Sequence, residues 1–117
     1  MTGKCQNLKF GFTAAATSAD TECSSDGERY AQMLTDCKLG FELGYDCAWV
    51  LEHHFTDYFP TPSPIVVMSH LAAAFPGLSL GSCVLVLPWY NPLRLAEEIS
   101  MLSHFCKGDL HLAFGRG

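Results

Sequence analysis

Apolar runs alternate with helix-like segments along this chain, and this alternation constrains the fold more than any other feature. The apolar runs cover residues 8–14, 46–52, 78–87 and 110–114, so they recur at intervals of roughly thirty residues. Near-continuous apolar runs are typical of strands buried on both faces. The order strand, helix, strand, helix, strand, helix, strand predicts successive parallel β/α units with the helices outside the sheet.

Each predicted helix begins with a recognisable cap. Ser25 and Glu28 have the spacing of a capping box, and Tyr30, Met33, Leu34, Cys37 and Phe41 then recur at helical intervals. Ser63 and Asn91 are each followed by proline, which suits the first helical position. Gly44 and Gly108 are expected to end the first and third helices.

Composition excludes several classes of protein. The net charge of −5 and the sequence pI near 5.3 argue against nucleic-acid binding. No apolar run is long enough to cross a bilayer, and residues 1–11 lack the apolar core of a secretory signal, so we expect a cytoplasmic protein. The six cysteines form no CxxC pair and are expected to be reduced thiols. Trp49 and Phe55 are expected in the core.

Polar residues follow the second apolar run at Glu52-His53-His54. If strand alternation persists there, His53 faces away from Glu52 and His54, which is poor geometry for a zinc site, so no metal is expected. Glu52 and His54 could instead form a hydrogen-bonded polar cluster that caps the strand. His70, His104 and His111 are more typical of packed or solvated histidines.

The last predicted strand is followed by Gly115-Arg116-Gly117. Arginine can hold a phosphate through two hydrogen bonds, and flanking glycines let the backbone approach closely. No G-x-G-x-x-G fingerprint opens any of the helices, so a dinucleotide site is not indicated. Trp89 and Tyr90 follow the third run and could form a wall of an apolar substrate pocket.

Four blocks together resemble the N-terminal part of the bacterial luciferase-like flavin monooxygenases. They are residues 44–55 (GYDCAWVLEHHF), 81–88 (GSCVLVLP), 91–98 (NPLRLAEE) and 114–117 (FGRG). The alternation alone permits either an open doubly wound sheet or an eight-stranded barrel, and the resemblance implies the barrel. The fold class is therefore α/β, with parallel β/α units forming the N-terminal half of a (β/α)8 TIM-type barrel that is incomplete in this chain.

The resemblance implies roles for particular residues. His53 corresponds to the histidine beside the flavin that assists proton transfer. Cys83 and Val84 correspond to the strand position that presents backbone to the flavin ring, often through a cis peptide bond, although nothing in these residues demands one. Arg116 corresponds to the ligand of the flavin phosphate. The implied cofactor is FMN in its reduced form, FMNH₂, which with O₂ oxygenates an aldehyde or another small organic substrate.

The resemblance also implies partners. A separate flavin reductase would supply the reduced flavin, and the full-length enzyme would be a dimer. Two alternatives stay open: a deazaflavin-dependent oxidoreductase of the same superfamily, and a non-catalytic partner subunit. The chain departs from the family pattern at Ser103, at residues 106–109, and at Gly115, where the luciferase catalytic subunit has a reactive cysteine. The last departure favours a non-luminescent relative.

Chain length bears on domain organisation. A full barrel needs roughly 250 residues, so residues 1–117 are expected to form a single partial domain, a fragment ending on an uncovered strand. An open apolar edge promotes aggregation. We therefore expect residues 1–117 alone to be poorly folded or aggregated, and inactive, unless two such halves pair as a dimer.

Overall fold

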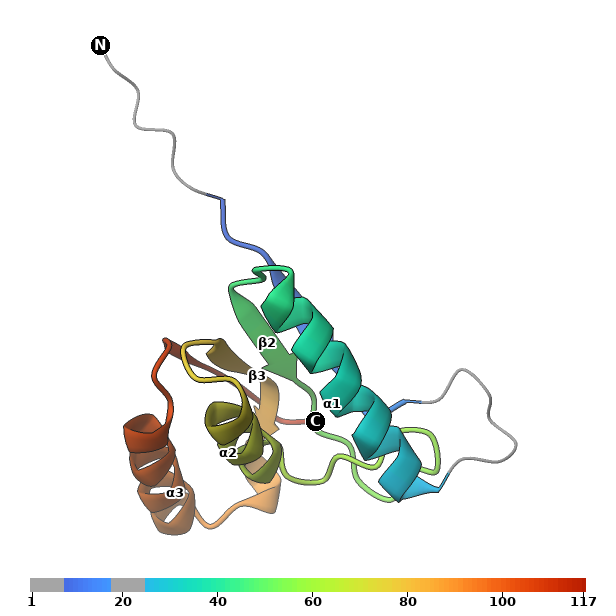
Figure 1. The fold of residues 1–117 in the computed structure, drawn as a ribbon. Coiled ribbons are helices and arrows are strands. Elements are labelled where there is room, and N and C mark those ends of the chain that lie inside the picture. The colour runs from blue at the N-terminus through green and yellow to red at the C-terminus, as the bar shows by residue number, and fades with distance from the viewer. Residues whose placement is uncertain (1–7, 18–24) are drawn as a thin grey trace.

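The described part of the chain forms four parallel strands and three α-helices (Figure 1). The computed structural model describes residues 8–17 and 25–117. The strands lie in chain order across one sheet, and each pairs in parallel with the next. In sequence, the elements are β1 (Gly11–Ala14), α1 (Asp26–Glu42), β2 (Cys47–Val50), α2 (Pro64–Ala74), β3 (Ser79–Val86), the 3₁₀ turn η1 (Leu87–Trp89), α3 (Pro92–Phe105) and β4 (Leu110–Gly115).

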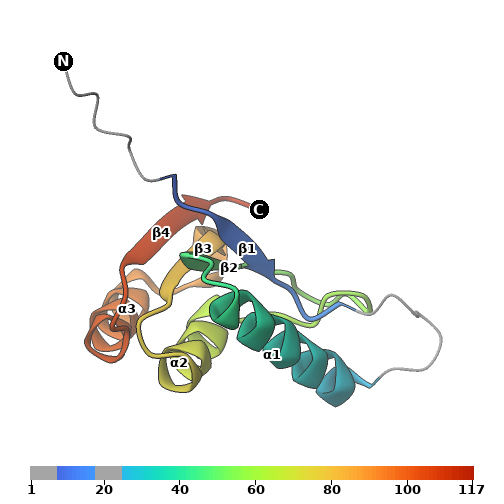
Figure 2. The same cartoon turned by 45° about the horizontal axis from the view of Figure 1, so that its top comes forward.

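All three α-helices cover the same face of the sheet (Figures 1 and 2). This follows from the strand order, because successive right-handed crossovers that always step in one direction leave every helix on one side. A doubly wound sheet reverses direction and places helices on both faces. The arrangement is therefore that of consecutive units of a β/α barrel, which confirms the predicted fold class.

The hydrophobic core lies between the sheet and the helices. Leu80 and Leu85 of β3 and Met68 and Leu71 of α2 are fully buried there, together with Val50 of β2. In β2 the core residues Ala48 and Val50 alternate, as expected for side chains that point to one face of a sheet. In β3 the core residues are an odd number of positions apart, because the strand is irregular between them. We call this side of the sheet the helix face.

No helix of residues 8–17 and 25–117 lies on the opposite side of the sheet, which we call the uncovered face (Figure 2). Trp49 lies across it. A Cβ atom at Gly11 would come within 2.5 Å of the Trp49 indole nitrogen, and one at Gly81 within 2.4 Å of the indole carbon Cε3. The ring of His111 stacks on the indole with 5.8 Å between the ring centroids. Glycines on both neighbouring strands thus make room for one large side chain.

The predicted N-terminal caps are confirmed, whereas α3 ends at Phe105 with Cys106 as its C-cap, two residues before the predicted Gly108. The Ser25 hydroxyl accepts a hydrogen bond from the Glu28 backbone N–H at 3.3 Å, and the Glu28 carboxylate accepts one from the Ser25 N–H at 2.7 Å. Ser63 accepts from the backbone of α2, and Asn91 accepts from two N–H groups of α3. Gly44 follows α1 with φ +81°, a conformation that glycine adopts at little cost.

Strand bounds differ from the sequence prediction at the ends. Regular pairing of β1 begins at Gly11 rather than Leu8, and β2 ends at Val50 rather than Glu52. Beyond Val50, the contact with the end of β3 is a hydrogen bond from the Val86 backbone N–H to the Glu52 carboxylate, in place of a bond between the two backbones. The cysteines at positions 37, 47, 83 and 106 are free thiols. Among the described residues, no helix is both long and apolar enough to span a membrane.

Candidate active site

The carboxyl ends of β2, β3 and β4 emerge at one edge of the sheet, which we call the carboxyl rim. Parallel pairing aligns Val50 with Ser82 and aligns Val86 with Gly115. The segments that follow β2 and β4 therefore lie on either side of the end of β3. In parallel β/α folds this rim is where loops gather around a site.

A buried carboxylate organises the rim. The Glu52 side chain is fully buried, and its Oε1 atom lies 2.6 Å from Nε2 of His54. Its Oε2 atom accepts hydrogen bonds from the Val86 backbone N–H and from the Tyr90 hydroxyl, both at 2.9 Å. Burial, followed by the hydrogen bond to Glu52 and its negative charge, raises the pKa of Tyr90. Glu52 thus ties the loop after β2 to the end of β3 and to the start of α3.

The Glu52–His54 hydrogen bond confirms the polar cluster that the sequence allowed. Its other two partners, Val86 and Tyr90, were missed by sequence reasoning. They lie 34 and 38 residues away along the chain, and no local pattern links them to Glu52. The only available signal was that Val86 ends, and Tyr90 follows, a buried strand whose carboxyl end should lie beside that of the preceding strand.

Aromatic side chains surround the two histidines. The ring of His54 stacks on Trp89 with centroids 4.7 Å apart and an interplanar angle of 27°. The prediction that Phe55 belongs to the core is wrong: it is 96% exposed, its φ is +54°, and its ring meets the edge of Trp89 at 6.3 Å. The left-handed backbone turns Phe55 out to the rim instead of continuing the strand.

The His53 ring contacts aromatic side chains of the loop after β2, and β2 itself ends at Val50, so the strand alternation assumed for residues 52–54 does not hold there. The ring of His53 lies 4.8 Å from Phe59 and 6.4 Å from Tyr58, centroid to centroid, and its backbone N–H donates to the carbonyl of Thr61 at 3.0 Å. Within the part of the chain that the structure describes, no hydrogen bond reaches the imidazole of His53. The ring is half-buried and is available to a bound molecule.

The peptide bond between Cys83 and Val84 is cis. Cys83 is exposed, and the β3–β4 pairing shifts register between Ser82 and Leu85. Ser82 bridges that irregularity, because its hydroxyl accepts from the Ala113 N–H and donates to the Ala113 carbonyl, both at 3.0 Å. Sequence reasoning placed Ser82, Cys83 and Val84 together at this strand position but did not predict that the Ser82 side chain binds the neighbouring strand.

Arg116 follows β4 and is exposed. The neighbouring Gly115 lies so close to β3 that a Cβ atom there would come within 2.6 Å of Cγ2 of Val84. Gly117 has φ +86°, which also favours glycine. Arg116 directly follows the pair formed by Gly115 and Val86, and no ion pair to Arg116 occurs within residues 8–17 and 25–117.

His53 follows β2 and Arg116 follows β4, near the carboxyl ends of these strands, whereas Cys83 and Val84 lie within β3. His53 follows Glu52, which is bonded to Val86, and Val86 pairs with Gly115 next to Arg116. No cluster of His, Cys, Asp and Glu suited to a metal ion occurs among the described residues. The half-buried imidazole of His53 can exchange a proton, and the exposed guanidinium of Arg116 can bind a phosphate.

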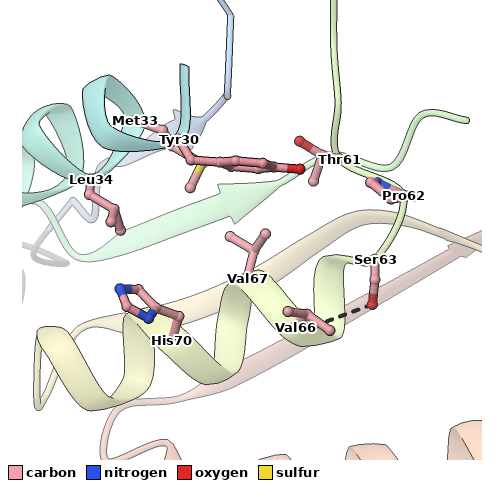
Figure 3. Close-up of a pocket in the computed structure, with 9 residues that line it drawn as sticks. All are labelled: Tyr30, Met33, Leu34, Thr61, Pro62, Ser63, Val66, Val67 and His70. Carbon is pink, nitrogen blue, oxygen red and sulfur yellow. Dashed lines mark hydrogen bonds between the residues drawn. The ribbon is translucent and has the colours of Figure 1, made fainter. Parts of the chain in front are cut away.

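A separate cavity of about 500 Å³ lies on the helix face, between α1 and α2 (Figure 3). Tyr30 and Met33 of α1 face Val67 of α2 across it, and His70 lies at its far end. Thr61 closes the other end, and its hydroxyl has no hydrogen-bond partner among the described residues. This mostly apolar cavity contains none of the predicted site residues.

Comparison with known proteins identifies the family. The family model described as luciferase-like monooxygenase matches residues 9–117. The chain belongs to this family. The alkanal monooxygenase alpha chain of Photorhabdus luminescens is 35% identical over 80 residues, which cover 68% of this chain and 22% of that protein.

Two further similarities concern a curated relative and a solved structure. The oxygenase component of the flavin-dependent trigonelline monooxygenase of Acinetobacter baylyi is 28% identical, with 75% of this chain and 24% of that protein covered. The monooxygenase RslO1 of Streptomyces bottropensis superimposes with a TM-score of 0.82 and 27% identity, over 94% of this chain and 33% of that one. This luciferase-like chain therefore spans between a fifth and a third of these relatives.

Proposed function

We propose that this chain supplies the flavin-binding rim of a monooxygenase that uses reduced FMN and O₂ to oxygenate an organic substrate, an aldehyde or a similar compound. Membership of the luciferase-like family supports the reaction class. The observation that carries the proposal is the parallel pairing of β3 with β4, in which Gly115, directly before Arg116, is the partner of Val86 at the end of β3.

The residues at the rim fit the proposed cofactor. Arg116 would hold the FMN phosphate, because its planar guanidinium can donate two parallel hydrogen bonds and no carboxylate of the described chain neutralises it. The backbone at Cys83 and Val84 would support the ring system. His53 would hold or transfer a proton, since its imidazole has no hydrogen bond within the described residues. Bound flavin would supply the electrons and the reaction with oxygen.

The proposed enzyme also needs partners. The Acinetobacter relative is designated the oxygenase component of its system. By analogy we propose that a separate flavin reductase delivers FMNH₂ to this enzyme. We further propose that the full-length enzyme is a dimer and acts in the cytoplasm.

The test compares flavin binding and turnover in the full-length protein. Arg116→Ala should weaken FMN binding by at least roughly tenfold, because it removes a charge-assisted contact to phosphate. His53→Ala should lower turnover by roughly 10²–10⁴-fold without changing FMN affinity. His104→Ala, at an exposed position of α3, is the matched control and should change neither.

Three results would overturn the proposal. Exclusive binding of deazaflavin would indicate the hydride-transfer branch of the superfamily. Unchanged turnover in His53→Ala would make this histidine structural. A full-length protein that binds no flavin but stabilises a catalytic partner would be a non-catalytic subunit.

A further inference from the structure

Glu52 presents its carboxylate to three donors from three different segments. Val86 contributes a backbone N–H, which can only donate, and Tyr90 contributes its hydroxyl, both to Oε2. His54 approaches the other oxygen, Oε1, at 2.6 Å. Two donors on Oε2 make this side chain an acceptor, and a fully buried carboxylate is held only when its oxygens are satisfied in this way.

The short contact to Oε1 decides which nitrogen of His54 carries the proton. A neutral imidazole has one N–H donor and one bare acceptor nitrogen. Two acceptors at 2.6 Å would repel each other, so Nε2 must carry the hydrogen. Nδ1 is then left with its lone pair.

The ring of His54 is fixed in the other direction as well. Trp89 stacks on the ring of His54 at a centroid distance of 4.7 Å, and the side chain of His54 is 20% exposed. Nδ1 makes no hydrogen bond within the described residues. The carboxylate holds one edge of the ring and the indole covers one face, so the remaining edge is available at the carboxyl rim.

We propose that Glu52 is a positioning residue that holds His54 in the Nε2–H tautomer, and that Nδ1 of His54 serves the rim as a second proton acceptor beside His53. The proposal deepens the proposed function and depends on it for the reaction that is served. Nδ1 takes a proton from a substrate or cofactor group, the ring becomes an imidazolium, and the same proton returns in a later step. The Glu52 carboxylate stabilises the positive charge through the bond at Nε2.

Buried carboxylates play this part in other enzymes, where they orient a histidine base and fix its tautomer without accepting the proton themselves. At this rim the carboxylate is also bonded to Val86 and Tyr90, so it cannot rotate away without breaking three hydrogen bonds. The geometry therefore favours one ring orientation and one tautomer.

The first experiment measures the tautomer in the unaltered site, and a variant is needed only to assign the signal. Nitrogen-15 spectra of the histidine side chains of the full-length protein distinguish the two neutral tautomers, and His54→Gln assigns the signal by its loss. We expect an Nε2–H signature for His54 at neutral pH, with or without FMN. An Nδ1–H signature, or an even mixture of tautomers, would overturn the proposal.

The second experiment separates proton transfer from structural support. In His54→Gln the amide N–H can still donate to Glu52, but no basic nitrogen remains. We expect turnover to fall by roughly 10²-fold or more, with FMN affinity and Tm unchanged. His104→Gln makes the same substitution at an exposed site and should leave turnover unchanged. Full turnover in a folded His54→Gln protein would refute the role of Nδ1.

Glu52→Gln tests the positioning role itself. The amide keeps the size of the side chain but can present either an oxygen or an N–H to His54, so the tautomer signature should become mixed and turnover should fall by roughly tenfold or more. A single unchanged Nε2–H signature in this variant would contradict the proposal. If Glu52→Gln does not fold, the proposal is still tested by the tautomer signature of the wild-type protein and by the turnover of His54→Gln. Failure of the proposed function is distinguishable, because it would appear as absent flavin binding in the wild type.

Discussion

The two faces of the sheet differ in what fills them. On the helix face, leucine, valine and methionine side chains such as Leu80 and Met68 are fully buried against α1, α2 and α3. On the uncovered face, Trp49 spans the gap over Gly11 and Gly81 with His111 stacked on it. The helix face thus carries the packing that stabilises the fold, while the other face and its rim keep side chains accessible.

The largest expected difference between the faces is in thiol reactivity. Cys37 is fully buried in the core, and burial followed by the charge of Asp36 raises its pKa to about 11. Cys83 is exposed. Because the thiolate is the reactive form, Cys83 should be alkylated by iodoacetamide at pH 8 at least roughly 10²-fold faster than Cys37. Peptide mass spectrometry measures both rates in one sample, and equal rates would contradict the comparison.

Leu80→Ala tests the packing of the helix face. Removing a fully buried leucine side chain leaves a cavity and should lower the free energy of unfolding by about 2–5 kcal/mol. Urea unfolding of the full-length protein, followed by fluorescence, measures the change. A loss below about 1 kcal/mol would show that this face is loosely packed.

Gly81→Ala tests the packing of the uncovered face. The added Cβ would lie 2.4 Å from Cε3 of Trp49, so the indole must shift, at a cost of about 1–3 kcal/mol. Trp49→Leu should relieve the clash, and the double variant should lose less stability than the two single variants added together. Strict additivity in this cycle would mean that the two side chains do not meet.

Thr13→Ala should have the smallest effect. Thr13 pairs with Trp49 in the β1–β2 register but is exposed at the edge of the sheet. We expect the free energy of unfolding to change by less than about 0.5 kcal/mol in the urea experiment used for Leu80→Ala. A loss as large as that of Leu80→Ala would remove the distinction between the faces.

Features that depend on neighbouring residues were predictable from the sequence. The caps at Ser25, Ser63 and Asn91 form with partners two or three residues away, so their spacing could be read directly. The order of the strands followed from their regular alternation with helices. Family resemblance, rather than residue chemistry, then distinguished a barrel from a doubly wound sheet.

Features that depend on distant residues could not be predicted in detail. The carboxylate of Glu52 binds partners from the next β/α unit, and nothing in the local pattern names Val86 or Tyr90. Phe55 was predicted to be buried because it is apolar, yet its positive φ turns it outward beside Trp89. The roles of His53, Cys83, Val84 and Arg116 stay predictions until flavin binding and turnover are measured.

Ser82 makes the irregularity in the sheet tolerable. At the point where the two main chains fall out of step, its hydroxyl acts as both missing partners for Ala113. Replacing Ser82 with alanine would remove the hydrogen-bond partner of both the N–H and the carbonyl of Ala113 in β4. The hydroxyl oxygen of Ser82 thus keeps β4 hydrogen-bonded to β3 at the point where the backbone pairing is irregular. It thereby also helps to fix the position of Arg116, which follows β4.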